Sequence, residues 1–83
     1  MIDVRKYQRQ WKLEELRELN GDTQEQMANL LNINTTSFRN KEKGDTEFKA
    51  TEMFIIAKHY GKTLEEIFLP PKFTFSELEK QKA

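Results

Sequence analysis

The side chains that could do chemistry in this sequence are few, and they favour hydrogen bonding over catalysis. His59 is the only histidine and the chain has no cysteine, so the usual partners for a nucleophile or a zinc ion are missing. The acidic side chains have the spacing of solvated helix faces: Glu14, Glu15, Glu18, Glu65 and Glu66. We therefore expect a protein that is not an enzyme and that uses no metal or cofactor.

Amide and hydroxyl side chains are concentrated between Asn34 and Lys43 instead. The run Asn-Thr-Thr-Ser at 34–37 is typical of a turn followed by a helix start, so Asn34 or Thr35 would cap a helix that runs to Lys43. Phe38 is nearly the only apolar residue of that helix. Such a helix lies on the surface or faces a polar partner. Anchored by one Phe on its inner edge, it has the free outer edge that a groove-reading helix requires.

Glycines and capping residues divide the chain into the short helices that must position this segment. Gly21, Gly44 and Gly61 each follow a segment with helical spacing, and each would end a helix in the left-handed conformation. Thr23 can cap a second helix and Thr63 a short last one, because a hydroxyl accepts a hydrogen bond from a free backbone N–H. The pattern predicts five helices and an all-α fold.

The fourth helix carries most of the apolar surface, and we expect it to be the most buried. Its apolar residues are Met53, Phe54, Ile56, Ala57 and Tyr60. With 83 residues and no disulfide, the chain forms one domain around a single modest core. After Pro70-Pro71, the run Lys72-Phe73-Thr74-Phe75 alternates as a short strand does, and we expect its two phenylalanines to pack on something.

The charges cancel overall but are unevenly distributed. Residues 1–12 hold four basic side chains against one acidic, residues 13–32 hold five acidic against one basic, and residues 35–43 hold three basic against one acidic. The longest apolar run, Met53 to Ala57, is too short to span a membrane. We expect no membrane association, and the cytoplasm is the default compartment.

From Leu13 to Phe68 the sequence resembles the helix-turn-helix domain of phage repressors and Cro proteins, the XRE-like family. The resemblance rests on Leu-Glu-Glu-Leu-Arg, Asn-Gly-Asp-Thr-Gln-Glu-Gln-Met-Ala-Asn-Leu-Leu, Asn-Ile-Asn-Thr-Thr-Ser-Phe, Glu-Lys-Gly and Leu-Glu-Glu-Ile-Phe, in register and without a gap. It implies a five-helix, lambda-repressor-like domain. In that domain the second helix crosses the DNA backbone and the third, Thr35 to Lys43, enters the major groove.

The resemblance also implies which residues contact DNA. The base-facing positions are occupied by Asn34, Thr35, Thr36 and Asn40; Asn suits adenine, and Thr suits a hydrogen-bonding edge or a thymine methyl. Helix capping is the competing role for the first three, so Asn40 is the clearer base contact. We expect phosphate contacts from Thr23 and Gln24 at the start of the second helix and from Arg39, Lys41 and Lys43.

By the same resemblance, Arg17 and Glu42 form a partly buried ion pair between the first helix and the end of the third. The sequence departs from the family pattern at several positions. Lys41 replaces an apolar residue, and we expect its stem to lie on apolar surface while its ammonium extends toward the DNA. Phe48 stands where proline is common, and we expect it at the rim of the core.

We expect the domain to span residues 9–69, between an N-terminal arm or helix extension at 1–8 and a C-terminal tail at 70–83. Two interpretations of the arm remain open. Either Trp11 packs beside the first helix and residues 1–5 are loose, or Arg5, Lys6 and Arg9 reach phosphates. The tail either pairs with a second chain or folds back onto the domain.

Two binding functions compete. In the first, the protein is a transcriptional regulator that binds double-stranded operator DNA as a homodimer on a palindromic site and represses by occluding polymerase. In the second, it acts on a protein, such as a partner repressor or a toxin, which would suit its neutral charge. The Asn, Thr and Arg side chains of the third helix favour the first, because buried protein interfaces favour aromatic residues.

Overall fold

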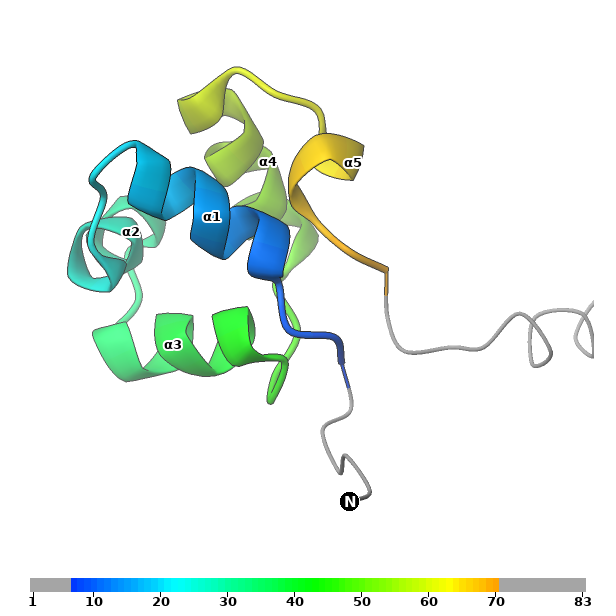
Figure 1. The fold of residues 1–83 in the computed structure, drawn as a ribbon. Coiled ribbons are helices and arrows are strands. Elements are labelled where there is room, and N and C mark those ends of the chain that lie inside the picture. The colour runs from blue at the N-terminus through cyan, green and yellow to red at the C-terminus, as the bar shows by residue number, and fades with distance from the viewer. Residues whose placement is uncertain (1–6, 71–83) are drawn as a thin grey trace, which may run out of the picture.

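Five helices and no strand make up the part of the chain that the structure, a computed structural model, describes, residues 7–70 (Figure 1). They are α1 (Trp11–Leu19), α2 (Gln24–Leu31), α3 (Thr35–Lys43), α4 (Ala50–Tyr60) and α5 (Leu64–Ile67). The expected five-helix, all-α fold is confirmed. The strand expected at 72–75 lies outside the described residues. None of the helices within 7–70 has the length and apolar content needed to cross a membrane.

Side chains close to the helix starts fix where α2 and α3 begin. Thr23 Oγ1 accepts from the backbone N–H of Gln26 at 3.0 Å, while Gln26 Oε1 accepts from the N–H of Thr23 at 2.8 Å, which is a reciprocal capping box. Asn34 Oδ1 accepts from the N–H of Ser37 at 2.7 Å. Between these two helices Asn32 adopts the left-handed conformation, with φ 58°, so the turn is tight and sets the angle between α2 and α3.

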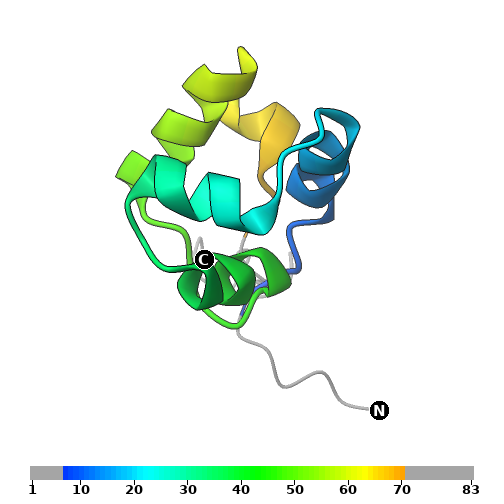
Figure 2. The same cartoon turned by 90° about the vertical axis from the view of Figure 1, so that its left-hand side faces the viewer.

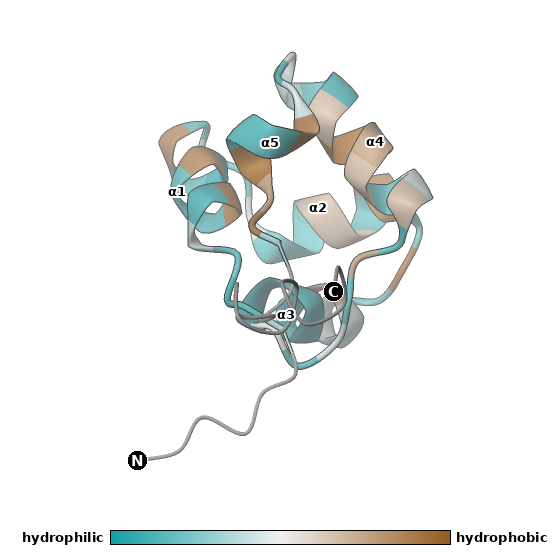
Figure 3. Ribbon diagram, turned by 90° about the vertical axis from the view of Figure 1, so that its right-hand side faces the viewer, coloured by the Kyte–Doolittle hydropathy of each residue, from teal (hydrophilic) through white to brown (hydrophobic). Residues whose placement is uncertain are grey.

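The core draws at least one side chain from every helix and one from the loop before α4. It consists of Leu13, Met27, Ala28, Leu31, Phe38, Phe48, Ile56, Ala57 and Ile67, all less than a tenth exposed. Each large side chain buried in this way contributes about 1.5–3 kcal/mol. In Figure 3 the ribbon of α4 is largely apolar and that of α5 partly so, whereas α3 is almost wholly hydrophilic.

Phe48 belongs to this core and does not lie at its rim. Its ring meets Phe38 of α3 edge-on at a centroid distance of 5.8 Å and Phe68 at 5.3 Å, and only 4% of its surface is exposed. Edge-to-face aromatic pairs contribute about 0.5–1.5 kcal/mol beyond the area they bury. Phe48 therefore ties α3 to the segment that follows α5.

The expectation that α4 is the most buried helix is wrong. Ile56 and Ala57 face the core, but Phe54 is 61% exposed and Ile55 is 41% exposed. An α-helix has 3.6 residues per turn, so a helix that packs on one side only leaves the apolar residues of its other side in solvent. The exposed pair Phe54–Ile55 is an apolar surface on the outside of α4.

Helix α3 lies at one edge of the molecule (Figures 1 and 2). It packs mainly against α2 and also against α1. Figure 1 shows α3 lengthwise, and none of the other four helices covers its lower side. A partner can therefore approach α3 without any rearrangement of the domain.

Candidate nucleic-acid interface

The outer face of α3 carries a polar stripe. Thr36, Asn40 and Lys43 are spaced by four and three residues, so they share one side of the helix. Thr36 is exposed, and the other two are partly exposed. On the opposite side, Phe38 and Glu42 have 0% and 1% of their surface exposed. The buried pair holds the helix rigidly while the stripe points outward.

The structure separates the four residues expected to face bases. Asn34 is exposed, but its side-chain oxygen is occupied in capping α3, and Thr35 is half-buried. Thr36 and Asn40 lie on the outer stripe. Within residues 7–70, the Asn40 amide has no hydrogen-bond partner, so both its donor and its acceptor are available. Asn40 and Thr36 are the best placed of the four to read base edges.

Lys41 does not extend its ammonium outward, which corrects the expectation that it contacts phosphate. Its Nζ donates to Glu52 Oε1 at 2.5 Å, and the two side chains are only 11% and 8% exposed. Lys41 lies three residues after Phe38 and therefore on the inner side of α3. The lysine joins α3 to the start of α4. By contrast, Lys43 is 42% exposed and lies 3.6 Å from Asp45 Oδ2.

Arg17 and Glu42 form the ion pair that the family resemblance implies. Arg17 Nε and Nη2 donate to the two carboxylate oxygens of Glu42 at 2.9 and 3.1 Å, and the side chains are 11% and 1% exposed. Burial alone would lower the pKa of Arg17, but its hydrogen bond to Glu42 and the charge of that carboxylate raise it. Arg17 Nη1 also donates to the carbonyl oxygen of Asp22 at 3.1 Å. The pair thus links α1, α3 and the turn before α2.

The start of α2 lies beside α3. Gln24 Nε2 donates to Glu42 Oε1 at 2.9 Å, and Arg39 Nε donates to Gln24 Oε1 at 3.3 Å. Thr23 and Arg39 are both exposed. The first N–H groups of a helix carry partial positive charge and attract anions. The structure therefore brings together Thr23, Gln24 and Arg39, three of the five residues expected to contact phosphates.

Asp22 holds the start of α2 against the end of α4. It accepts at Oδ2 from the hydroxyl of Tyr60 at 2.8 Å and lies 3.3 Å from His59 Nε2. The Tyr60 hydrogen bond lowers the pKa of Asp22 despite the opposing effect of burial. Burial first, and then the hydrogen bond to Asp22, raise the pKa of Tyr60. His59 is exposed on α4 and is a surface partner of Asp22.

These two pKa shifts predict how stability depends on pH. The depressed pKa of Asp22 gives stability that is present above its unfolded value, about pH 4, and lost as the pH falls further. The raised pKa of Tyr60 gives stability that is present below about pH 10 and lost above it. Tyr60→Phe should lower the free energy of unfolding at pH 7 by about 1–2 kcal/mol. In a plot of that free energy against pH, measured by urea unfolding at each pH, it should also flatten the acid limb and the alkaline limb.

Asp22→Asn is the companion variant for this measurement. It removes the titrating carboxylate but keeps a side chain of the same shape, so it should flatten the acid limb while leaving most of the alkaline limb. An unchanged acid limb in both variants would show that Asp22 does not carry the dependence.

Residues 7–10 lie against the end of α3. The N–H groups of Tyr7 and Gln10 donate to the carbonyls of Gly44 and Glu42 at 3.1 and 2.8 Å. The buried Gln10 side chain bonds both the N–H and the carbonyl of Leu69, at 2.7 and 3.2 Å. Arg9, one of the three arm residues expected to reach phosphates, is paired with Glu14 at 2.9 Å. The other two, Arg5 and Lys6, precede the described residues.

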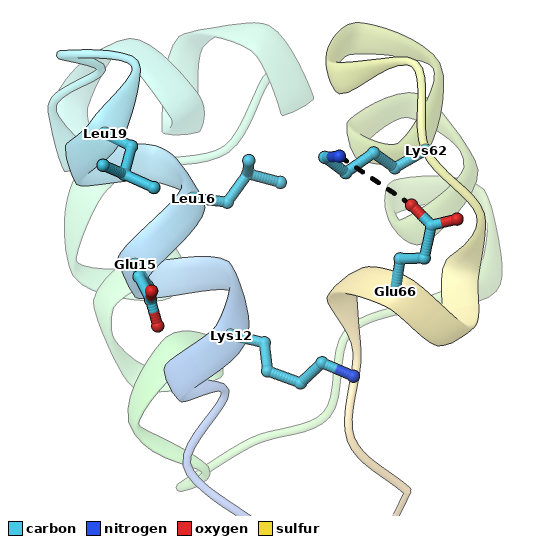
Figure 4. A pocket seen from close by; sticks show the side chains of 6 residues that line it. All are labelled: Lys12, Glu15, Leu16, Leu19, Lys62 and Glu66. Carbon is cyan, nitrogen blue, oxygen red and sulfur yellow. Dashed lines mark ion pairs between the residues drawn. The ribbon is translucent and has the colours of Figure 1, made fainter.

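A shallow groove of about 450 Å³ lies between α1 and α5 (Figure 4). It is lined by Lys12, Glu15, Leu16, Leu19, Lys62 and Glu66. Lys62 and Glu66 approach within 3.9 Å, and Lys12 Nζ donates to the Glu65 carbonyl at 2.9 Å. No cluster of His, Asp and Glu suited to a metal ion occurs among residues 7–70. The groove is lined by two leucines with two lysines and two glutamates around them, an arrangement that suggests no catalytic chemistry.

The comparisons with known proteins agree with this geometry. The model of the helix-turn-helix family matches residues 13–67, and the chain belongs to this family, the XRE-type helix-turn-helix proteins. None of the curated proteins that were compared matches the chain.

Two solved structures share the fold. The restriction-modification controller protein C.AhdI from Aeromonas hydrophila is similar with a TM-score of 0.60 at 24% identity, over 69% of this chain and 83% of that one. A transcriptional regulator from Listeria innocua is similar with a TM-score of 0.70 at 19% identity, over 93% of this chain and 72% of that one. At these identities the likeness shows the fold.

Proposed function

We propose that this chain is a sequence-specific DNA-binding transcriptional regulator that inserts α3 into the major groove. One observation carries the proposal: the outward stripe of Thr36, Asn40 and Lys43, on a helix held from behind by Phe38 and Glu42. The family assignment supports it, because the helix-turn-helix uses its second helix, here α3, to read base edges.

Asn40 and Thr36 carry the sequence specificity in this proposal. The Asn40 amide can donate to and accept from the major-groove edge of one adenine at the same time, a pairing that discriminates by about 1–3 kcal/mol against other bases. Thr36, one turn earlier on the same face, meets the neighbouring base through its hydroxyl or its methyl group. Asn34 caps the start of α3 with its side-chain oxygen, so only its side-chain NH₂ group is left to reach DNA.

Phosphate contacts at the C-terminal end of α3 and along its side hold it in the groove. Lys43 lies at its C-terminal end, and Arg39, with the start of α2, lies along its side. Because the whole chain has no net charge, these local cations must supply the electrostatic attraction. Lys41, bound to Glu52, takes no part.

We propose further that the regulator binds as a homodimer on a palindromic operator and represses by excluding polymerase. One α3 helix contacts only a short half-site of the DNA. A second copy of the protein, bound about one turn of the DNA helix away, multiplies the specificity. Measuring the mass of the complex on a selected duplex tests this part. A single protomer per duplex at saturation would contradict it.

Substituting Asn40 tests the base contact. On a duplex enriched from a random-sequence library by the wild-type protein, Asn40→Ala should weaken binding by about 10- to 100-fold and relax the preference at one base pair. Binding to an unrelated duplex should stay the same, because that binding uses phosphates. Fluorescence anisotropy at several salt concentrations measures both.

Asn29→Ala is the matched control, since Asn29 is an exposed asparagine on α2 away from the outer stripe of α3. It should bind both duplexes as the wild type does. Retention of full specificity by Asn40→Ala would contradict the proposed orientation of α3.

A second function is favoured by the exposed Phe54–Ile55 surface. Large apolar side chains on the outside of a small domain are typical of protein contacts, so the chain could act by binding a partner repressor or a toxin. In that case no duplex would be enriched from the library, and the product of a neighbouring gene would bind. Phe54→Ser would abolish that complex.

A further inference from the structure

A chain of hydrogen bonds runs from the interior to the surface along α2 and α3. The buried carboxylate of Glu42 accepts from Gln24 Nε2 at 2.9 Å, and Gln24 Oε1 accepts from Arg39 Nε at 3.3 Å. Glu42 is 1% exposed, Gln24 is half-buried and Arg39 is exposed. Gln24 therefore lies between a fixed anion and a surface cation.

The charge of Glu42 decides which way the Gln24 amide faces. A carboxylate paired with Arg17 is ionised and can only accept hydrogen bonds. Gln24 must therefore turn its NH₂ group inward to Glu42, and its carbonyl oxygen then faces Arg39. The oxygen in that position cannot bind a phosphate oxygen, because both atoms are acceptors, and Glu42 takes one of the two hydrogens of the NH₂ group.

Arg39 is oriented by the same contact. Its Nε–H is used by Gln24, while the two terminal amino groups of the planar guanidinium carry the remaining donors. A long exposed arginine normally loses much conformational freedom when it binds. A side chain already braced at Nε loses less, so its contact with an anion is stronger.

We propose that Gln24 is a positioning residue for Arg39 and that Arg39 makes the phosphate contact at this point. This inference rests on the proposed DNA-binding function and differs from the family-based expectation that Gln24 itself contacts phosphate. The buried Glu42 directs the arrangement through Gln24. Arg39 and α2 consequently engage the DNA backbone as one unit.

A double-mutant cycle of Gln24→Met and Arg39→Met tests this, with the library-enriched duplex as the probe. Met has the length of Gln but no amide. Gln24→Met should weaken binding by about three- to tenfold in the wild-type background and by less than about twofold in the Arg39→Met background. Arg39→Met should also lower the slope of log K against log salt by about 0.9, the value for one phosphate contact.

Equal losses from Gln24→Met in both backgrounds would overturn the proposal, because Gln24 would then contact the DNA directly. If the wild type binds its duplex with Asn40-dependent specificity and the cycle is additive, only this inference fails. If the wild type enriches no duplex, the regulator function fails and this inference fails with it. Asn29→Ala serves as the control in both backgrounds and should change nothing.

A second measurement needs no DNA. In ¹H–¹⁵N spectra of the free protein, the Arg39 Nε–H signal should exchange with water more slowly than that of an arginine side chain that makes no hydrogen bond. Gln24→Met should remove that protection. The melting temperature of the variant, measured alongside, distinguishes loss of the Gln24–Arg39 hydrogen bond from loss of the fold. If the Arg39 Nε–H of the wild type exchanges with water as fast as that of an unbonded arginine, Gln24 does not position Arg39 and the proposal is overturned.

Discussion

Glu42→Ala is expected to lower the free energy of unfolding by about 3–5 kcal/mol, because it leaves the buried guanidinium of Arg17 without its counter-charge. Both carboxylate oxygens of Glu42 are used, by Arg17 and by Gln24, and burial makes water a poor substitute. For a domain of this size the loss corresponds to roughly 15–30 °C in melting temperature. Thermal and urea unfolding followed by circular dichroism measure it.

Glu14→Ala is the matched control, since it breaks an ion pair with the same chemistry at the surface. Arg9 and Glu14 approach within 2.9 Å, but their side chains are 59% and 21% exposed. We expect less than about 1 kcal/mol from that variant. Equal melting temperatures for Glu42→Ala and Glu14→Ala would show that burial does not make the Arg17–Glu42 pair special.

Gly44→Ala should have the next largest effect, about 2–4 kcal/mol. Gly44 has φ +94°, a conformation that costs other residues about 1–2 kcal/mol. A Cβ atom there would also lie 2.5 Å from the carbonyl oxygen of Tyr7 and 2.9 Å from backbone atoms of Gln8. The segment of residues 7–10 would have to move, and its hydrogen bonds to Glu42 and Gly44 would weaken.

Gly61→Ala isolates the conformational part of this effect. Gly61 has φ +64°, but a Cβ atom there would meet nothing within 4 Å, so we expect about 1 kcal/mol. Hydrogen exchange should also show faster exchange of the Tyr7 and Gln10 amides in Gly44→Ala only. Equal destabilisation by the two variants would mean that residues 7–10 do not pack closely on Gly44.

Features with a local cause could be predicted from the sequence. The caps at Thr23 and Asn34 depend on residues no more than three positions away, and each helix end marked by Gly44 or Gly61 follows from one glycine. The polar outer side of α3 followed in the same way, because nearly all its apolar content is Phe38.

Features that depend on the tertiary arrangement could not be predicted. Lys41 was expected to face the DNA because its partner, Glu52, lies on another helix whose orientation no local pattern specifies. Phe54 looked like a core residue because apolar type alone does not tell which side of α4 is covered. The Arg17–Glu42 pair, 25 positions apart, was expected only through the family resemblance.

The contacts of Gln8 bear on how the protein should be labelled. Its Nε2 donates to the Pro70 carbonyl at 3.2 Å, while the N–H of the neighbouring Tyr7 donates to the carbonyl of Gly44, which ends α3. Both ends of the described domain therefore emerge at one corner, next to the helix proposed to enter DNA. A purification tag or fluorophore joined beyond either end of the described domain starts from that corner. Binding constants are therefore best measured with the tag removed and the dye on a cysteine introduced by Lys58→Cys, because Lys58 is exposed on α4 and the sequence has no cysteine of its own.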